Sequence, residues 1–265
     1  MVSLASFLDK DKLAIVGIII GIMLSLSPVP TFIDIAVRSK TTGGYTAAPY
    51  ISAFLCCSMW LTYAFLAGSS KSDLIPLNAL SFVIYFIYCG VFLFYANNKS
   101  RVLQLYMAAL GVLAITVTAA IFTKSLILIG VLATIANCLM FAAPLAVLNQ
   151  VIQTKSVRYM PFLLSLTSFL CASVWLVWAI VVQDYFVLIP NALGTFFGLI
   201  QLVLYAIYWR MSSREPDPDE SASMAGSRRE AGRMGRYSEE ELTPMKKRIG
   251  ADTASTVSTI STVRQ

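Results

Sequence analysis

"RSKTTGGYTAAPYISAFLCCSMW" (residues 38–60) and "QTKSVRYMPFLLSLTSFLCASVW" (residues 153–175) are two copies of one pattern. In each copy a lysine stands twenty residues before the final tryptophan, and each copy ends in Cys-x-Ser-x-Trp. Self-similarity at this scale indicates that one structural unit occurs twice in the chain. The duplication is the feature that predicts the fold.

The similarity continues on both sides of these stretches. Downstream of each copy lies an apolar run that contains proline and asparagine, "LIPLNAL" (74–80) and "LIPNALG" (188–194). Upstream lies an apolar run with a proline at its third position, "LSPVPTF" (26–32) and "AAPLAVL" (142–148). Each repeat unit therefore holds three apolar segments in the same order.

The composition is that of a helical membrane protein. Of the 265 residues, 57% are hydrophobic and 13% are charged, and the mean hydropathy is +0.73. A soluble domain of this length needs a larger share of charged residues. Seven apolar stretches can each cross a hydrocarbon core of about 30 Å as a helix; they cover 13–35, 47–67, 74–96, 102–122, 126–149, 161–182 and 186–209. The sequence predicts an all-α membrane protein with seven transmembrane helices.

The repeat predicts how these helices are grouped. Three helices, one spacer helix and three more helices follow one another, so both units cross the membrane in the same direction. This arrangement gives two parallel three-helix bundles joined by a linker helix. We expect the first bundle over residues 1–100, the linker over 101–124 and the second bundle over 125–210. Residues 211–265 have low hydrophobicity and mixed charge, which predicts a disordered cytoplasmic tail.

Basic residues in the short connections predict the orientation, because cytoplasmic loops carry an excess of Lys and Arg. One side of the membrane would carry Arg38, Lys40, Lys99, Arg101, Lys155, Arg158, Arg210 and Arg214. The other side would carry Lys10, Lys12, Lys71 and Lys124. We therefore expect the N-terminus outside and the tail in the cytoplasm. The plasma membrane is the expected location, with an endomembrane or the vacuole left open.

Several classes of function are not supported by the sequence. The chain has no histidine, which removes most zinc sites and the usual catalytic triads. No phosphate-binding glycine loop is present, and the five cysteines all fall in apolar stretches, where they behave as small apolar residues. We expect no enzyme activity, no cofactor, no metal site and no nucleic-acid partner.

Asn78 and Asn191 are the first candidate binding residues. An amide side chain inside a membrane span commonly forms a hydrogen bond to a neighbouring helix. Two amides at equivalent repeat positions, however, can face one cavity from opposite sides. An amide both donates and accepts hydrogen bonds, which suits a sugar hydroxyl.

Trp60 and Trp175 form the second candidate pair. A tryptophan in a span is usually a packing residue or an interfacial anchor. Their equivalent placement in the two units favours a shared role, because indole faces can stack on the apolar face of a pyranose ring. Two amides and two indoles would make a carbohydrate site.

At this point the chain resembles the SWEET family of sugar transporters. The resemblance is carried by "LSPVPTF" (26–32), by Lys-x3-Gly-Tyr-x3-Pro-Tyr (40–50), by "TKSVRYMPF" (154–162) and by the two Ile-Pro…Asn segments. It covers essentially all of residues 13–209. The chain departs from the family at Gly43 and Arg158, where an acidic loop residue is expected in each repeat.

The resemblance implies further site residues. It assigns substrate contacts to the positions of the paired asparagines and tryptophans. Pocket shape would be set by Leu24, Cys56, Met140 and Cys171, and a hinge tetrad would be formed by Pro28, Pro49, Pro144 and Pro161. The resemblance also implies an aromatic inner gate of Tyr45 and Tyr159 and an outer gate of Tyr63 and Asp184. Asp184 as an ordinary solvated loop charge is the competing interpretation.

The sequence thus predicts an uncoupled, bidirectional carrier of mono- or disaccharides, glucose among the candidates. No charged residue lies in the middle of any span, whereas coupled carriers usually need one there. A carrier of the same fold for another small neutral solute and a seven-helix receptor are the alternatives. The lipid bilayer is an expected partner, and a homo-oligomer and cytoplasmic partners of the tail remain open.

Overall fold

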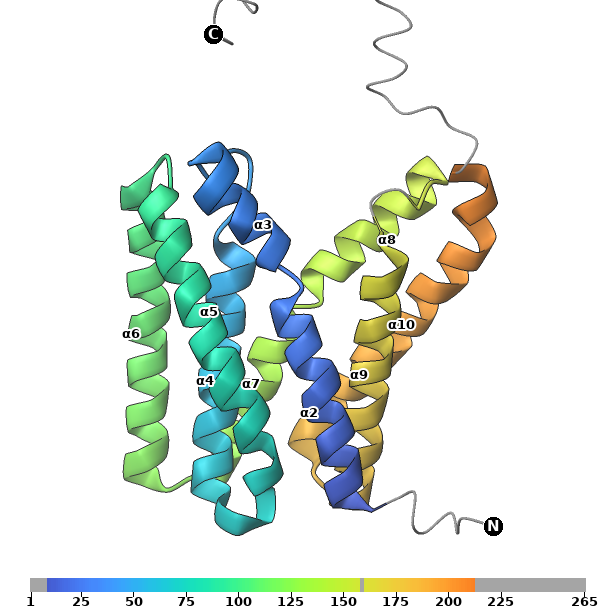
Figure 1. The fold of residues 1–265 in the computed structure, drawn as a ribbon. Coiled ribbons are helices and arrows are strands. Elements are labelled where there is room, and N and C mark those ends of the chain that lie inside the picture. The colour runs from blue at the N-terminus through green and yellow to red at the C-terminus, as the bar shows by residue number, and fades with distance from the viewer. Residues whose placement is uncertain (1–8, 158–159, 213–265) are drawn as a thin grey trace, which may run out of the picture. The chain divides into compact units, whose positions relative to one another are not determined.

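The computed structural model describes residues 9–157 and 160–212 (Figure 1). Its α-helices are α2 (Lys10–Leu26), α3 (Val29–Ile33), α4 (Ala48–Ala67), α5 (Ile75–Tyr95), α6 (Lys99–Thr123), α7 (Leu126–Leu139), α8 (Ala142–Thr154), α9 (Phe162–Val181) and α10 (Tyr185–Ser212). A π-helix, η1 (Asp34–Ser39), and a 3-10 helix, η2 (Gly68–Leu74), complete the described elements. The expected tail beyond residue 212 lies outside the described residues.

The described chain contains seven membrane spans. Six continuous helical segments are long and apolar enough to cross a membrane, and one of them, Ala48–Tyr95, has 48 residues. That segment holds two spans, because η2 connects α4 to α5 and the two helices pack against each other. The first span consists of α2, α3 and η1, and the fifth consists of α7 and α8. The predicted all-α fold with seven spans is confirmed.

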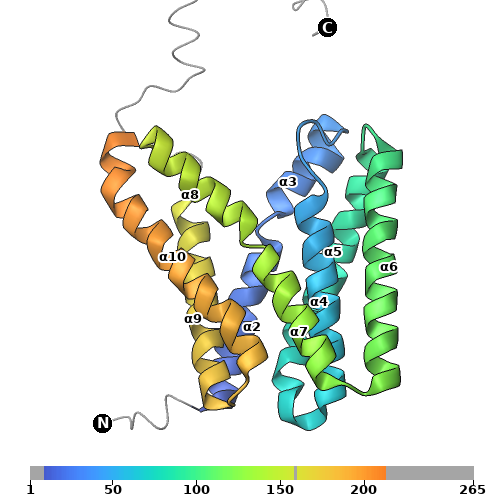
Figure 2. The same ribbon diagram turned by 180° about the vertical axis from the view of Figure 1, so that it is seen from behind.

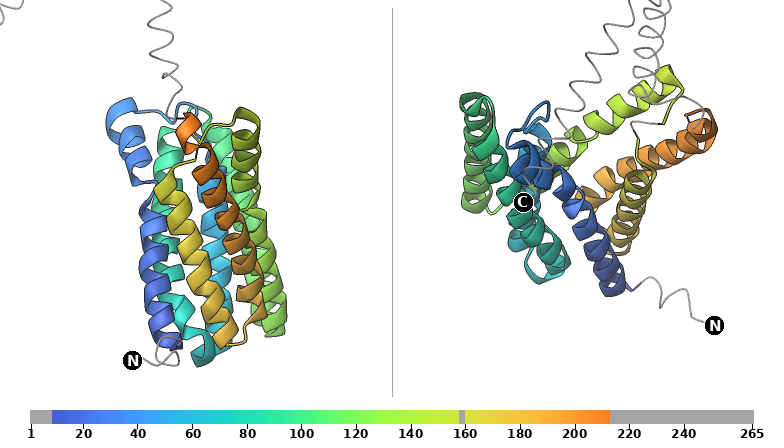
Figure 3. Two further views of the ribbon diagram at one scale, coloured as in Figure 1. Left: turned by 90° about the vertical axis from the view of Figure 1, so that its right-hand side faces the viewer. Right: turned by 45° about the horizontal axis from the view of Figure 1, so that its top comes forward.

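Each repeat unit forms a three-helix bundle with its third helix in the middle. In the first bundle α5 packs against both α2 and α4, and in the second α10 packs against both α7 and α9. Between the bundles, α2 packs on α9 and α4 packs on α7. The linker α6 packs against α4, α5 and α7 at the edge of the molecule (Figures 1 and 2). Figure 3 shows the spans of both bundles running roughly along one axis.

The bundles meet on one side of the membrane and separate on the other. We call the side where α2 begins the N-terminal face and the side where α10 ends the C-terminal face. One buried cluster contains residues of both bundles and lies toward the N-terminal face: Leu13, Ala14, Met59, Trp60, Tyr63, Ala64, Ile129, Ala133, Trp175, Trp178 and Val187 belong to it. Since this apolar cluster is shared, the N-terminal halves of the bundles are packed into one body.

Toward the C-terminal face each bundle has a core of its own. The first bundle buries a cluster around Phe32, Phe54 and Phe92, and the second buries a smaller one around Val151 and Met160. In Figures 1 and 2, α3 and α8 lean away from each other on this side. The molecule therefore opens toward the C-terminal face.

Two of the four predicted hinge prolines lie at helix breaks. Pro28 lies between α2 and α3, where the Ser27 N–H donates to the Leu24 carbonyl at 3.1 Å. Pro144 lies in the first turn of α8, just after the break between α7 and α8, where the Met140 N–H donates to the Asn137 carbonyl at 3.1 Å. Proline lacks the backbone donor, so neither residue can continue the hydrogen-bond ladder across the break.

The remaining prolines mostly start helices. Pro49 lies in the first turn of α4, Pro76 lies in the first turn of α5, and Pro161 immediately precedes α9. The N–H that proline lacks would be unpaired at these positions in any case. Pro190 differs, because it lies inside α10.

Pro190 leaves a carbonyl oxygen inside α10 without its usual partner. The missing N–H would have paired with the carbonyl of Phe186, four residues earlier. That oxygen lies 2.9 Å from the Thr134 hydroxyl of α7, which shares its hydrogen between this carbonyl and that of Gly130 at 2.8 Å. A neighbouring helix thus satisfies the freed carbonyl, as membrane helices require.

Glycine allows close helix contact within the second bundle. Gly130 of α7 lies against Phe186 of α10, and a Cβ atom at this glycine would stand 2.7 Å from a ring carbon. Gly111 of α6 has no neighbouring atom within 4 Å of the corresponding position. Both residues are inside helices, so replacing glycine by alanine raises the intrinsic helix propensity equally at the two positions.

We therefore expect Gly130→Ala to destabilise the protein and Gly111→Ala to leave it unchanged or slightly more stable. Overpacking of a tight contact typically costs about 1–3 kcal/mol. The thermal unfolding midpoint of the purified protein in detergent measures both effects. Equal midpoints for the two variants would contradict the proposed packing of α7 on α10.

Candidate functional site

A cavity of about 230 Å³ lies between the two bundles. We call it the central cavity. It is lined by side chains from α2, α4, α5, α7, α9 and α10 and from the break after α7. All eight residues predicted to bind substrate or shape the pocket line it: Asn78, Asn191, Trp60, Trp175, Leu24, Cys56, Met140 and Cys171. No lining residue is Asp, Glu, Lys or Arg.

The two asparagines have matching geometry. The Asn78 Nδ2 donates to the Leu74 carbonyl at 2.8 Å, and the Asn191 Nδ2 donates to the Val187 carbonyl at 2.7 Å. Each bond returns to the preceding turn of the residue's own helix, so neither amide joins two helices. An amide has two donor hydrogens and an acceptor oxygen. Within the described residues the second N–H and the oxygen of each have no partner, which leaves them available to a ligand.

The two tryptophans are held in matching ways as well. The Trp60 ring packs edge-on against Tyr63 at 5.6 Å between centroids, and Trp175 packs edge-on against Trp178 at 5.4 Å. In both units the supporting aromatic residue follows three positions later. Gly17 of α2 lies directly against the Trp175 indole. These contacts fix the orientation of both rings at the edge of the cavity.

Asn137 is a cavity residue that the sequence reasoning missed. It lies in the last turn of α7 and lines the central cavity. Its side chain has no hydrogen-bond partner among the described residues. The 116-residue spacing between Pro28 and Pro144 places Gly21 at its repeat position, so pairing of polar residues did not reveal it. The sequence signal that could have identified Asn137 was an amide side chain within an apolar span.

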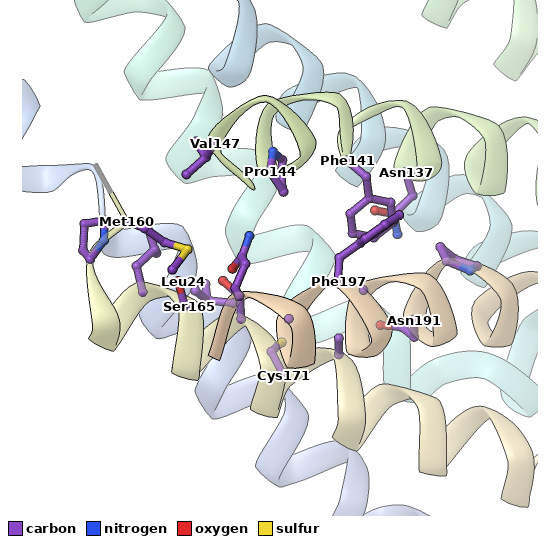
Figure 4. Close-up of a pocket in the computed structure, with 18 residues that line it drawn as sticks. Leu24, Asn137, Phe141, Pro144, Val147, Met160, Ser165, Cys171, Asn191 and Phe197 are labelled. Atoms are coloured by element: carbon purple, nitrogen blue, oxygen red, sulfur yellow. The ribbon is translucent and has the colours of Figure 1, made fainter. Parts of the chain in front are cut away.

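A second hollow of about 400 Å³ continues from the central cavity into the second bundle (Figure 4). We call it the second-bundle recess. It lies between α8, α9 and α10, and Leu24, Asn137, Cys171 and Asn191 line both hollows. Pro144 and Pro161 lie on its wall. The recess therefore extends the central cavity toward the C-terminal face.

Asp184 is buried at the N-terminal face, with its side chain 1% exposed. The Tyr63 hydroxyl donates to its Oδ2 at 2.8 Å, and the Lys71 ammonium lies 2.9 Å from the same oxygen. Tyr63 and Lys71 belong to the first bundle and Asp184 to the second. The interpretation of Asp184 as a solvated loop charge is therefore wrong, and the hydroxyl–carboxylate bond joins the two bundles.

The other oxygen of Asp184 caps α10. The Oδ1 accepts hydrogen bonds from the backbone N–H groups of Phe186 and Val187 at 3.1 and 3.2 Å. A side-chain acceptor at this position satisfies donors that the first helical turn leaves unpaired. Helix α10 thus begins at the same carboxylate that holds the bundles together.

A second polar contact crosses between the bundles nearby. The Trp178 indole N–H donates to the Asp73 carboxylate at 3.4 Å, and Lys71 lies 5.6 Å from the centre of the same indole ring. Lys10 of α2 lies 3.6 Å from Asp73. Sequence reasoning did not single out Asp73, whose repeat position at the 113-residue spacing is Phe186, and it used Lys71 only to predict the orientation.

The predicted inner gate is only partly described. Tyr45 lies on the connection between η1 and α4 at the C-terminal face and is half exposed. Tyr159, its predicted partner, lies outside the described residues. In the part of the chain that the structure describes, no cluster of three His, Cys, Asp or Glu residues could hold a metal ion.

Two repeat-related bundles around an uncharged central cavity, joined at one face and open at the other, define a seven-helix membrane protein of the 3+1+3 type. The family model described as "Sugar efflux transporter for intercellular exchange" matches residues 11–100 and 127–213, which are the two bundles without most of the linker. The chain therefore belongs to the SWEET family, the family that its sequence resembles.

Individual relatives agree with this assignment. Bidirectional sugar transporter SWEET7b of Oryza sativa subsp. indica is 36% identical over 219 residues, covering 79% of this chain and 82% of the relative. Bidirectional sugar transporter NEC1 of Petunia hybrida is 36% identical over 218 residues, covering 79% and 82%. A solved structure of a eukaryotic SWEET transporter aligns with a TM-score of 0.71 at 30% identity, covering 76% of this chain and 99% of that chain.

We expect removal of the two cross-bundle partners of the Asp184 Oδ2, by Tyr63→Phe with Lys71→Met, to loosen the N-terminal face. Breaking a buried ion pair by removing one partner costs about 3–5 kcal/mol, so amide exchange should rise about tenfold or more. Hydrogen–deuterium exchange of the backbone amides of residues 182–188, with the protein in nanodiscs, measures this increase. The Asp184 cap on α10 is untouched by these changes.

Lys10→Met is the matched control, because Lys10 lies on the same face but pairs only within the first bundle. This variant should leave exchange at residues 182–188 unchanged. Unaltered exchange in the double variant as well would show that the Asp184 contacts do not hold the bundles together.

Proposed function

We propose that this chain is a facilitative, bidirectional transporter that moves mono- or disaccharides across a membrane by alternating access. The observation that carries the proposal is the pairing of two half-free amides and two fixed indoles around one cavity between the repeat units. The relatives named as bidirectional sugar transporters support the same substrate class.

The chemistry of the central cavity suits a neutral polyhydroxyl ligand. Asn78, Asn137 and Asn191 offer donors and acceptors from different sides, and a sugar hydroxyl can use both kinds. Trp60 and Trp175 offer apolar ring faces to the C–H face of a pyranose. A charged solute would need a charge partner, and the lining contains none. A small neutral solute other than a sugar is the alternative that this lining leaves.

The conformation of the molecule supports alternating access. The Asp184 contacts and the shared apolar cluster close the N-terminal face, while α3 and α8 diverge at the C-terminal face. Pro28 and Pro144 lie at equivalent helix breaks in the first and fifth spans. At each break the part of the span near the C-terminal face can bend relative to the part near the N-terminal face. In our proposal these halves close over the sugar as the Asp184 contacts open. Tyr63 and Asp184 then form the outer gate, and Tyr45 belongs to the inner gate.

The orientation follows from the basic residues. Arg38, Lys40, Lys99 and Lys155 lie at the C-terminal face, so we propose that this face is cytoplasmic. The N-terminal face is then extracellular, and the described structure is open inward. We place the protein in the plasma membrane with residues 211–265 as a cytoplasmic tail that can meet cytoplasmic partners. Our proposal assigns no enzymatic reaction to the chain.

We expect Asn78→Leu and Asn191→Leu each to lower uptake of labelled sugar about tenfold or more. Leucine removes the donor and acceptor at nearly constant size, which leaves sugar hydroxyls unpaired at a cost of about 1–3 kcal/mol. Uptake of a sugar panel in transport-deficient cells, corrected for surface expression, measures it.

Asn149→Leu is the control for that experiment, since Asn149 is an exposed amide of α8 that lines neither hollow. Its uptake should equal that of the unaltered protein. Normal uptake in the Asn78 and Asn191 variants would remove the basis for the sugar site.

Transport should be almost independent of pH between about 5 and 8, because histidine is the only side chain with an ordinary pKa in this range and the chain has none. Influx and efflux of labelled sugar across proteoliposomes, with and without an imposed proton gradient, test this expectation. Accumulation driven by the gradient would contradict an uncoupled mechanism.

A further inference from the structure

The two bundles differ in how their C-terminal halves are filled. In the first bundle Phe32 stacks on Tyr88 at 4.2 Å between ring centroids and meets Tyr50 edge-on at 4.8 Å. The Tyr88 hydroxyl donates to the Ser25 carbonyl at 3.2 Å. Tyr85 packs edge-on against Tyr88 at 5.8 Å. Aromatic rings therefore fill the space between the three helices of this bundle.

The second bundle has small or polar residues at the equivalent places. The 115-residue spacing between Trp60 and Trp175 places Ser165 at the position of Tyr50. The 113-residue spacing between Asn78 and Asn191 places Gly198 and Gln201 at the positions of Tyr85 and Tyr88. Three tyrosines of one unit are thus serine, glycine and glutamine in the other.

The second-bundle recess lies where these three replacements meet. Ser165, Gly198 and Gln201 all line its volume of about 400 Å³. Its wall also carries Ser168 of α9, whose repeat counterpart is Ala53. The small or polar side chains at Ser165 and Gln201 therefore leave room beside α8, whereas Phe169 of α9 takes the space beside Gly198.

The lining of the recess is uncharged and combines polar with aromatic groups. Ser165 is 4% exposed, and within the described residues its hydroxyl has no hydrogen-bond partner. The side chains of Ser168 and Gln201 likewise have none in the described chain. Phe141 and Phe197 also line the recess, 5.7 Å apart between ring centroids (Figure 4). Ser168 and Gln201 are only partly buried, and polar groups that line a hollow without a protein partner can hydrogen-bond a polar ligand.

The recess is also continuous with the proposed sugar site. Asn137 and Asn191 line both hollows, so one ligand can contact the same amides from the two sides. The central cavity alone, at about 230 Å³, is smaller than the range of about 300–1,000 Å³ typical of small-molecule pockets. The recess adds room beside it rather than at a separate place.

We propose that the second-bundle recess binds the second sugar unit of a neutral disaccharide whose first unit occupies the central cavity. Ser165, Ser168 and Gln201 hydrogen-bond the hydroxyls of that unit, and Phe141 and Phe197 contact its apolar face. A hydrocarbon chain would leave all three polar side chains unpaired, which disfavours a lipid tail as the occupant. The proposal rests on the proposed sugar transport and specifies the substrate class of that site.

The test restores the tyrosines of the first bundle. Ser165→Tyr and Gln201→Tyr fill the recess, and Ser165→Ala removes only a hydroxyl and so tests the same contact without added bulk. Affinities of sucrose, maltose and glucose for the purified proteins are measured by titration calorimetry. Leu163→Tyr is the matched control, since Leu163 lies on the same helix and is 74% exposed.

The filled variants should bind at least one disaccharide about tenfold more weakly than the unaltered protein, while glucose affinity changes less than about twofold. Ser165→Ala should also lower the affinity for that disaccharide more than the affinity for glucose. Leu163→Tyr should change neither affinity. Unchanged disaccharide affinity, or an equal loss for glucose, would overturn the recess as a subsite. So would an unaltered protein that binds glucose and none of the disaccharides.

The two proposals fail in different ways. If the unaltered protein transports glucose and the filled variants behave like it toward disaccharides, only the subsite is wrong. If the unaltered protein transports no sugar of the panel, the proposed function itself is wrong.

Discussion

The buried carboxylate of Asp184 is the interaction on which the arrangement of the two bundles depends. Its Oδ1 caps the helix that carries Asn191, and its Oδ2 meets Tyr63 and Lys71 of the other bundle. A buried charge is tolerated only when it is paired, so the N-terminal face cannot open without exposing this group to water. The closed face is what gives the central cavity a floor. The cavity is therefore covered on the side of the N-terminal face.

Repetition of a unit explains why pairs of equivalent residues line the central cavity. Asn78 and Asn191 each bond the preceding turn of their own helix, and Trp60 and Trp175 are each supported by an aromatic residue three positions later. Local backbone geometry thus orients each half of the site before the bundles meet. The bonds that orient the two asparagines lie within one unit each, so movement of one unit against the other leaves them intact. This property suits a carrier that rocks about a central site.

Much of the fold follows from the sequence, because membrane spans and repeats are local patterns. Seven apolar stretches and one duplication predict the seven-helix architecture, and the structure places all eight paired candidates around one cavity. Asn137 and Asp73 escaped that reasoning because their repeat counterparts, Gly21 and Phe186, are not polar. The partner of Asp73 across the bundles, Trp178, is 105 residues away in the chain, and no local pattern relates such positions. Comparison of the two repeats identifies residues with the same role in both units, and it does not identify residues that act in only one unit.

The sequence by itself determined which residues are equivalent, since apolar length and repeat spacing depend on the order of residues alone. Only the tertiary structure decided which face is closed and where the space lies. Ser165, Gly198 and Gln201 are scattered over two helices, and they form a recess only because α9 and α10 pack together while α8 bends away after Phe141. A hollow forms where packed side chains leave space unfilled. That space depends on contacts between segments that are distant in the chain, so the order of residues alone does not reveal it.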